Sequence, residues 1–364
     1  MIAVSLFLCW TLGTMAVLLV VLAFYLYFFS YHPKTVEDCA IISDAKGKKL
    51  PKGKVLKIMT WNQEFFGGRN HVYFFDLPLN EGKRITVEES ELRRNKNHLV
   101  KIVKAEDPDI LLLQEVDERS SRTRMHDQEE ELAEKLKEYP YRTSAYYIKS
   151  GFHPHRHILR PWRMKLVIFS KYSINEAKRY QLSIKPALWI VRLFYLKRCV
   201  LEARIPFADG GHFSVMNTHL DAYAQGSNTM AKQVKEIKAL LTERTDQKIP
   251  WVIGGDFNLL PNDQARASLA DDQAEYYNPH TELHYLTKSF ALLPKKSETR
   301  GKQKKRWYTY APNRKDLFKL DRTTDYFFYS SLLMAKNHKV RSRDTQDISD
   351  HVPLIGEFKC KSGR

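Results

Sequence analysis

A series of short apolar runs between residues 55 and 360 constrains the fold of this 364-residue chain more than any other feature. The runs have the length of β-strands, and polar stretches with glycine or proline separate them. The candidate strands are residues 55–62, 109–116, 165–172, 199–207, 212–220, 250–260, 323–331 and 352–358. The run at 109–116 (DILLLQEV) is apolar enough for a strand that is buried on both faces.

Two stretches between these runs have apolar residues at helical spacing. They are residues 88–107, with Leu92, Leu99, Ile102 and Val103, and residues 227–243, with Met230, Val234, Ile237, Leu240 and Leu241. The first stretch stops before Pro108, and a proline is a usual helix boundary. Many strands with a few helices predict a mixed α/β sandwich, in which two sheets pack together and helices lie outside. No internal repeat is visible, so residues 55–360 are predicted to form one domain.

The first 31 residues contain no charged side chain. This run is longer than the roughly 20 residues that a helix needs to cross a bilayer. A cleavable signal peptide has a basic start, a shorter apolar stretch and a small-residue cleavage site, and none of these is clear here. Residues 1–31 therefore predict an uncleaved transmembrane anchor in a single-pass membrane protein. The polar residues 32–54 predict a linker to the domain.

The basic residues around this segment bear on its orientation. No Lys or Arg precedes the apolar run, whereas Lys34, Lys46, Lys48 and Lys49 follow it. By the positive-inside rule this favours a cytosolic C-terminal part, but single-span proteins often break the rule, so the side of the membrane stays open.

The net charge and the cysteines limit the partners. The formal net charge of +17 favours polyanions such as nucleic acid, anionic lipid headgroups or a phosphorylated substrate. The alternative is a solvated basic surface with no partner. Four cysteines without CxxC spacing (Cys9, Cys39, Cys199 and Cys360) imply neither a zinc site nor a disulfide framework. No protein partner is indicated.

Polar residues stand where the apolar runs stop. They are Asn62, Gln114, Glu115, Asn217, His219, Asp256, Asn258, Asp325, Asp350 and His351. Each one alone is explained by a turn, because Asn, Asp and similar residues commonly cap strand ends. Their repeated placement at the ends of apolar strands is harder to explain in this way, and it indicates one shared site.

The chemistry of these side chains is coherent. Asn, Asp and Glu oxygens suit a hard cation such as Mg²⁺ and not zinc, which calls for Cys or several His. Such a cation polarises a phosphoryl oxygen and stabilises a leaving oxygen. A histidine held by a carboxylate can take a proton from water near neutral pH, and an Asn and a second His can donate hydrogen bonds to the developing negative charge.

Six short motifs in this order, TWN, LLLQEV, NTHL, GGDFN, TTDYFF and SDH, resemble the signature of the endonuclease/exonuclease/phosphatase superfamily. That superfamily includes deoxyribonuclease-I-like nucleases, abasic-site endonucleases, inositol-polyphosphate phosphatases and neutral sphingomyelinases. The resemblance covers residues 55–360, and the segment AYAQGSNTMAKQ at 222–233 adds a likeness to bacterial membrane-anchored members. It implies a four-layered α/β sandwich with the site at one edge of the paired sheets.

The resemblance also implies a cofactor and a role for each polar residue. The cofactor is Mg²⁺, for which Mn²⁺ can substitute. The implied metal-binding residues are Glu115 as the principal ligand, Asn62 beside it and Asp350 as a further metal or structural ligand. The implied catalytic residues are His351 as general base, Asp325 to orient it, Asp256 to position the attacking water, Asn258 to contact the scissile phosphate, and His219 to stabilise the transition state.

The function that follows is hydrolysis of phosphodiester bonds by a membrane-anchored, Mg²⁺-dependent enzyme in which His351 activates a water. The substrate stays open between nucleic acid and phospholipid, with a phosphomonoester as a third possibility. The alternative from another class is a catalytically inactive membrane-bound module that docks nucleic acid or anionic lipid.

Three local segments bear on the substrate. Residues 151–165 are rich in histidine and arginine and favour a substrate-facing loop that contacts phosphate or headgroups rather than a metal site. Residues 185–198 mix aromatic and basic side chains, which fits either a strand pair or a surface that sits on a membrane. Residues 295–306 are basic and fit either a solvated loop or an electrostatic contact to a polyanion.

Overall fold

The computed structural model describes residues 2–43, 47–73, 84–151, 161–222, 226–313 and 319–361. Within these residues the strands form two seven-stranded sheets. The first sheet has the order β1 (Val36–Asp38), β7 (Glu176–Gln181), β8 (Cys199–Pro206), β9 (His212–His219), β10 (Trp251–Asp256), β12 (Asp325–Tyr329) and β11 (Ala291–Leu293). The second has the order β13 (Leu333–Val340), β14 (Leu354–Cys360), β3 (Val55–Asn62), β4 (Ile110–Asp117), β6 (Trp162–Ser170), β5 (Tyr141–Ser150) and β2 (Ile41–Ser43).

The described residues also form α-helices and short 3₁₀ helices. The α-helices of the described residues are α1 (Ile2–Phe29), α2 (Glu89–Glu106), α3 (Gln128–Lys135), α4 (Trp189–Arg192), α5 (Thr229–Asp246), α6 (Asp263–Arg266), α7 (Asp271–Ala274) and α8 (His284–Thr287). Short 3₁₀ helices are η1 (Glu64–Phe66), η3 (Ser121–Thr123) and η4 (Lys304–Trp307). The two helices expected from apolar spacing are α2 and α5.

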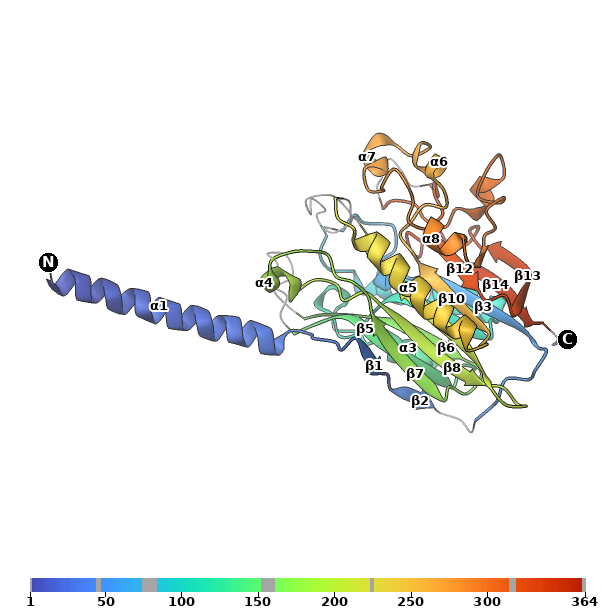
Figure 1. Ribbon diagram of the computed structural model, residues 1–364, viewed down its shortest axis with the longest axis horizontal. Coiled ribbons are helices and arrows are strands. Elements are labelled where there is room, and N and C mark those ends of the chain that lie inside the picture. The colour runs from blue at the N-terminus through green and yellow to red at the C-terminus, as the bar shows by residue number, and fades with distance from the viewer. Residues whose placement is uncertain are drawn as a thin grey trace.

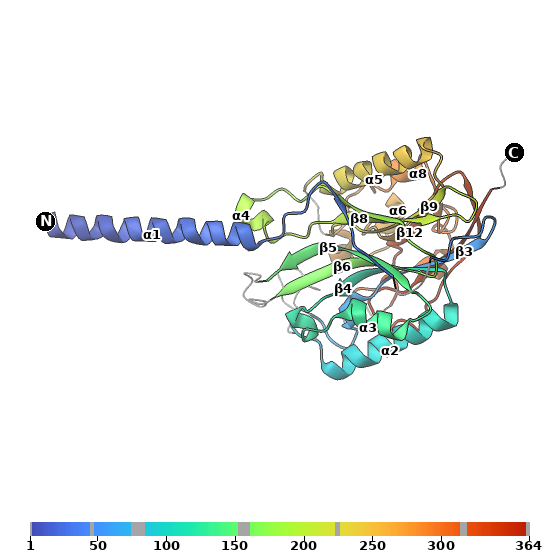
Figure 2. The ribbon, with the colours of Figure 1, turned by 90° about the horizontal axis from the view of Figure 1, so that it is seen from below.

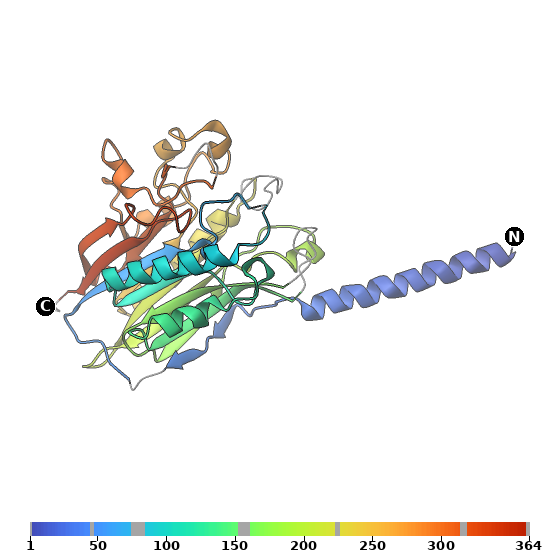
Figure 3. The same ribbon diagram turned by 180° about the vertical axis from the view of Figure 1, so that it is seen from behind.

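The two sheets pack face to face, and the long helices cover their outer faces (Figure 2). Helix α5 lies on the first sheet, while α2 and α3 lie on the second, as the view from behind also shows (Figure 3). Strand β4 shows how the sequence produces these layers, because alternate residues of a strand face opposite sides. Ile110 and Leu112 belong to the core between the sheets, whereas Leu111 and Leu113 belong to the core under α2. The predicted four-layered α/β sandwich is confirmed.

A pair of parallel strands lies inside each sheet and brings the polar strand ends together. In the second sheet β3 and β4 run parallel, so that Asn62 lies opposite Gln114. In the first sheet β9 and β10 run parallel, so that His219 lies opposite Asp256. Strand β12 is antiparallel to β10 and begins with Asp325 opposite Asp256. We call the end of the sandwich at which these five residues lie the polar edge.

Close contacts of β10 with its two neighbours, β9 and β12, explain the two glycines of GGDFN. Gly255 has a φ of 150° and lies opposite Thr218, and a Cβ at this position would be 1.9 Å from the Thr218 carbonyl oxygen. A Cβ on Gly254 would be 2.5 Å from the Phe327 ring. Only glycine therefore allows β10 to run so close to its neighbours immediately before Asp256.

The substitution Gly255→Ala is expected to lower the free energy of unfolding by at least about 3 kcal/mol, because backbone strain of about 1–3 kcal/mol adds to a backbone clash. Gly53→Ala is the matched control, since Gly53 also has a positive φ (80°) but nothing within 4 Å of its Cβ position. Urea denaturation followed by circular dichroism measures both variants. Equal stability of the two variants would show that the contact with Thr218 does not matter.

The segment before β3 is more than a linker. Residues 32–54 were expected to connect the anchor to the domain, but β1 and β2 lie within them. Val36 of β1 pairs with Tyr180 of β7, and Ile41 of β2 pairs with Thr143 of β5. These strands have mostly exposed side chains, so their pairing depends on backbone hydrogen bonds and leaves little apolar pattern in the sequence.

Helix α1 extends away from the sandwich (Figure 1). Its segment Cys9–Phe28 has a mean hydropathy of 2.1 and is not buried against the rest of the protein. By length and composition α1 is therefore able to cross a membrane, as a transmembrane anchor or a signal sequence would be.

The three segments singled out for the substrate have different outcomes. Residues 185–198 do not form a strand pair: they carry the short helix α4. Residues 295–306 form turns and most of η4 rather than an unstructured loop. Of the histidine-rich stretch, residues 152–160 lie outside the described part of the chain.

Candidate active site

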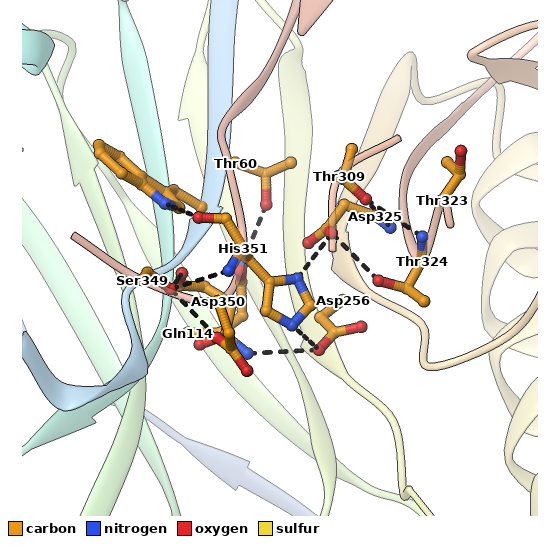
Figure 4. A network of polar contacts seen from close by, with 12 residues as sticks. Thr60, Gln114, Asp256, Thr309, Thr323, Thr324, Asp325, Ser349, Asp350 and His351 are labelled. Carbon is orange, nitrogen blue, oxygen red and sulfur yellow. Dashed lines mark hydrogen bonds and ion pairs between the residues drawn. The ribbon is translucent and has the colours of Figure 1, made fainter. Parts of the chain in front are cut away.

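The polar edge contains a pocket of about 290 Å³. Seven of the eight residues expected to form a site line it: Asn62, Glu115, His219, Asp256, Asn258, Asp350 and His351. The eighth, Asp325, lies behind the His351 ring and reaches the pocket only through it (Figure 4). The eight residues come from seven different strands or strand-connecting segments, and the fold brings all of them together.

The ring of His351 is held between two carboxylates. Its Nδ1 lies 2.8 Å from Oδ2 of Asp325, and its Nε2 lies 3.4 Å from Oδ2 of Asp256 (Figure 4). The backbone N–H of His351 donates to Oγ of Ser349, and its carbonyl accepts from the Trp61 indole N–H. The side chain is 96% buried. These contacts leave the imidazole one orientation, with Nε2 toward the pocket.

Asp256, the last residue of β10, contacts several other residues of the site. Its Oδ2 accepts a hydrogen bond from Nδ2 of Asn62 at 3.3 Å and lies 3.3 Å from Nε2 of His219. Its Oδ1 accepts from the backbone N–H of Asn258, which has a φ of 50°. Nδ2 of Asn62 also donates to Oε1 of Glu115 at 3.1 Å. A single amide thus connects the carboxylate of β10 with that of β4.

Glu115 projects into the pocket because β4 is irregular at this point. Its φ is 57°, a backbone conformation that residues other than glycine rarely adopt. A β-bulge also interrupts the pairing of β4 with β6 here. The backbone N–H of Glu115 donates to the Tyr147 hydroxyl. Across the pocket, Oε2 of Glu64 accepts from the backbone N–H of Asp350. Strained backbone of this kind is often found at functional sites.

Burial and neighbouring charges shift the pKa values of the acids. Burial raises the pKa of Asp256 to about 7, although the charge of His351 lowers it. Burial likewise raises the pKa of Asp350 to about 6; His351 lowers it and the negative charge of Glu115 raises it. Burial alone would lower the pKa of His351, but the carboxylates of Asp325, Asp256 and Asp350 raise it well above the ordinary value. The excess of carboxylates therefore holds a proton on His351.

The second histidine has the opposite shift. Burial lowers the pKa of His219 well below its ordinary value, and the positive charges of Arg198 and His351 lower it further. His219 is therefore neutral at pH 7. Its Nδ1 is buried without a hydrogen-bond partner among the described residues and lies 3.9 Å from Oε1 of Glu115.

These residues fit a divalent cation. Glu115 and Asp350 line the same pocket and disfavour each other's negative charge, and a cation between such groups removes that repulsion. It also offsets the carboxylates that hold the proton on His351. The donors that line the pocket are mainly carboxylate and amide oxygens, the set that Mg²⁺ prefers. A second possible set is Asp256, Asp325 and His351, whose ligand atoms lie within 4.8 Å of one another.

Some residues of the pocket were not expected. Arg198 lines it, and Nη1 of its guanidinium is buried without a hydrogen-bond partner among the described residues. Glu64 also lines the pocket. It lies two residues after Asn62, at the start of the 3₁₀ helix η1. Glu64 lies beyond the end of the run 55–62 and so outside the strand-end pattern. Arg198 directly precedes the run 199–207, but the sequence distinguished it only as part of the aromatic and basic segment 185–198. Conversely, Asn217 is a strand-end residue outside the pocket: its Nδ2 donates to the carbonyls of Leu113 and Val167 and joins the two sheets.

Comparison with known proteins gives a family and a fold. The model of the Endonuclease/Exonuclease/phosphatase family matches residues 59–351. A search of curated proteins gave no match.

Three solved structures illustrate the shared fold. An endonuclease/exonuclease/phosphatase from Beutenbergia cavernae is 19% identical with a TM-score of 0.56, covering 84% of this chain and 72% of that one. The human Nocturnin catalytic domain, solved with a bound sulfate anion, is 16% identical with a TM-score of 0.54, covering 89% and 97%. A protein of the same family name from Bacteroides vulgatus is 15% identical with a TM-score of 0.50, covering 85% and 100%.

At these identities the structures establish the fold, while the match over residues 59–351 establishes the family. The family comprises metal-dependent hydrolases that act on phosphoester bonds. The chain belongs to the endonuclease/exonuclease/phosphatase family.

Proposed function

We propose that this protein is a Mg²⁺-dependent phosphodiesterase in which His351 activates the attacking water. The observation that supports this most is the arrangement of His351, with Asp325 on one ring nitrogen and Asp256 beside the other. The two carboxylates lie on opposite sides of one buried imidazole, in a pocket that also presents further carboxylate and amide groups.

His351 acts as the general base. Asp325 accepts the Nδ1–H and fixes the tautomer. Once a bound cation offsets the carboxylates that otherwise hold a second proton on the ring, Nε2 carries the lone pair that takes a proton. Asp256, whose Oδ2 lies 3.4 Å from Nε2, positions the water. The water oxygen bonds to phosphorus, its proton passes to Nε2, and the bond from phosphorus to the leaving oxygen breaks.

Glu115 and Asn62 would hold the cation, with Asp350 as a further ligand. Glu115 faces the pocket from a bulged strand, which brings its carboxylate beside the Asn62 amide. When bound, Mg²⁺, or Mn²⁺ in its place, polarises a phosphoryl oxygen and stabilises the leaving oxygen.

His219, Asn258 and Arg198 surround the phosphate. His219 is neutral and can donate one hydrogen bond to the charge that develops on phosphorus oxygens. Asn258 uses one N–H for the carbonyl of Leu220, and its amide has a second N–H for a phosphate oxygen. Arg198 supplies positive charge at the same wall of the pocket.

We also propose that α1 is a transmembrane anchor, so that the enzyme works as a single-pass membrane protein. The substrate classes supported by this setting and by the net charge of +17 are nucleic acid and phospholipid.

The test uses the full-length protein in detergent, stripped of metal with EDTA. Bis(4-nitrophenyl) phosphate is the diester and 4-nitrophenyl phosphate the monoester control. We expect release of 4-nitrophenol from the diester only after addition of Mg²⁺ or Mn²⁺, because the pocket's acids are not compensated without a cation. Supercoiled plasmid and phospholipid vesicles then separate the two substrate classes.

Two results would contradict the proposal. Faster turnover of the monoester would make the protein a phosphomonoesterase. Salt-sensitive binding of plasmid or vesicles by folded protein that forms no product with any ester, unchanged by His351→Ala, would indicate the inactive docking module.

A further inference from the structure

Helix α4 exposes a continuous apolar run. The exposed fractions are 74% for Leu188, 58% for Trp189, 37% for Ile190 and 40% for Val191. Outside α1, the described residues contain no other run of four consecutive exposed large apolar side chains. Exposed apolar residues are common singly, but a contiguous group indicates a surface that is covered by a partner. We call residues 182–198, which carry this run, the α4 loop.

The α4 loop lies at the polar edge. It connects the end of β7, at Gln181, with the start of β8, at Cys199. Val200 pairs with Thr218, the neighbour of His219, so β8 begins at the end of the sandwich where the active site lies. Leu196 and Arg198 of the same loop line the pocket. The exposed run and the catalytic groups therefore share one end of the molecule.

The chain leaves α1 at this same end. The backbone N–H of Gln181 donates to the carbonyl of Thr35, and the Tyr31 hydroxyl contacts the carbonyl of Tyr146. Arg179 connects the two segments, because its guanidinium lies 5.6 Å from the Tyr31 ring centre and donates to the carbonyl of Lys197. Two perpendicular views show α4 beside the last turns of α1 (Figures 1 and 2).

Chain length limits how far this end lies from a bilayer. The apolar segment of α1 ends at Phe28, and Tyr31 is already in contact with the domain. Three residues span at most about 10 Å, so the polar edge is close to the lipid surface if α1 crosses the membrane. No flexible linker separates the two.

The chemistry of the α4 loop suits the lipid interface. A Trp with three aliphatic neighbours is followed by the exposed Arg192, and such a combination favours the boundary between acyl chains and headgroups. The loop is also braced from inside, since Nζ of the buried Lys197 donates to the Arg192 carbonyl. The contact of Lys197 thus holds the backbone next to the apolar run, whose side chains face the solvent.

We propose that the α4 loop inserts Leu188–Val191 into the bilayer that α1 enters and so holds the active-site pocket against the headgroup layer. The partner is the lipid surface itself. This inference depends on α1 as an anchor but not on the proposed reaction.

Tryptophan quenching by brominated lipid tests it. Full-length protein carrying Trp10→Phe, which removes the α1 tryptophan, is reconstituted into vesicles of phosphatidylcholine and phosphatidylglycerol with brominated or ordinary acyl chains. We expect clear quenching in the brominated vesicles and loss of most of it when Trp189→Phe is added. Trp307→Phe is the control, because Trp307 ends η4, which packs on β13 at the far edge of the second sheet.

Each outcome is decisive. No quenching in the Trp10→Phe protein, or quenching that persists without Trp189, overturns the proposal. The wild-type protein shows whether the anchor itself has failed, because Trp10 is quenched only if α1 is in the bilayer. Quenching in the wild-type protein but not in the Trp10→Phe protein means that α1 is inserted and α4 is not. Since Trp189 is more than half exposed, its replacement leaves the fold intact, and bis(4-nitrophenyl) phosphate hydrolysis in detergent serves as a separate check of the site.

Discussion

The His351→Ala protein is expected to lose phosphodiester hydrolysis by a factor of about 10²–10⁴ in kcat, with little change in KM. The ring is the group that takes the proton from water, and general-base catalysis contributes an acceleration of that size. Nδ1 of this ring is bonded to Asp325 and Nε2 lies beside Asp256. His219 also lies beside Asp256, but its Nδ1 has no hydrogen-bond partner among the described residues to orient the ring. Initial rates with bis(4-nitrophenyl) phosphate at saturating Mg²⁺ measure the effect.

Two further variants show whether the loss comes from the proposed role. Asp325→Asn should give a smaller loss of kcat, because the ring remains but its tautomer is no longer fixed. His338→Ala is the control, since His338 bonds Glu298 and stacks on Trp307 away from the pocket. Full activity of His351→Ala would remove the histidine from the mechanism.

The second large effect is expected from Glu115→Gln. The substitution keeps the size of the side chain and an oxygen that can accept from Asn62, but it removes the negative charge that binds a cation. We expect the apparent affinity for Mg²⁺ to fall by at least about 10- to 100-fold, the loss typical even of residues that only support metal ligands. Activity should recover in part at high Mg²⁺. Metal titrations of activity and calorimetric titrations of Mg²⁺ measure it.

Glu89→Gln is the matched control, because Glu89 lies on the surface of α2 in ion pairs with Arg93 and His126. It should leave Mg²⁺ affinity unchanged. If Glu115→Gln also leaves it unchanged, the cation does not bind at Glu115. The set formed by Asp256, Asp325 and His351 would then be the next candidate site to test.

Local patterns were enough to predict the central strands. The apolar run at 55–62 is β3 as expected, and 109–116 differs from β4 by one residue at each end. Both strands are mostly buried and five of the eight residues in each are apolar, so the run is visible without knowledge of its neighbours. Strands β5, β7 and β13 were not predicted, because exposed or polar residues interrupt their apolar pattern.

By itself the sequence determined the sandwich class, the apolar N-terminal helix, the family and a set of eight candidate site residues, one of them the buried His351. Only the tertiary structure decided how these groups meet: Asp325 behind the ring rather than in the pocket, Glu64 and Arg198 in its wall, and α4 beside the end of α1. The physical reason is that apolar periodicity reports the burial of each segment separately. Which side chains face one another depends on strand register and on bulges such as that at Glu115, and these arise only when the sheets pair and pack.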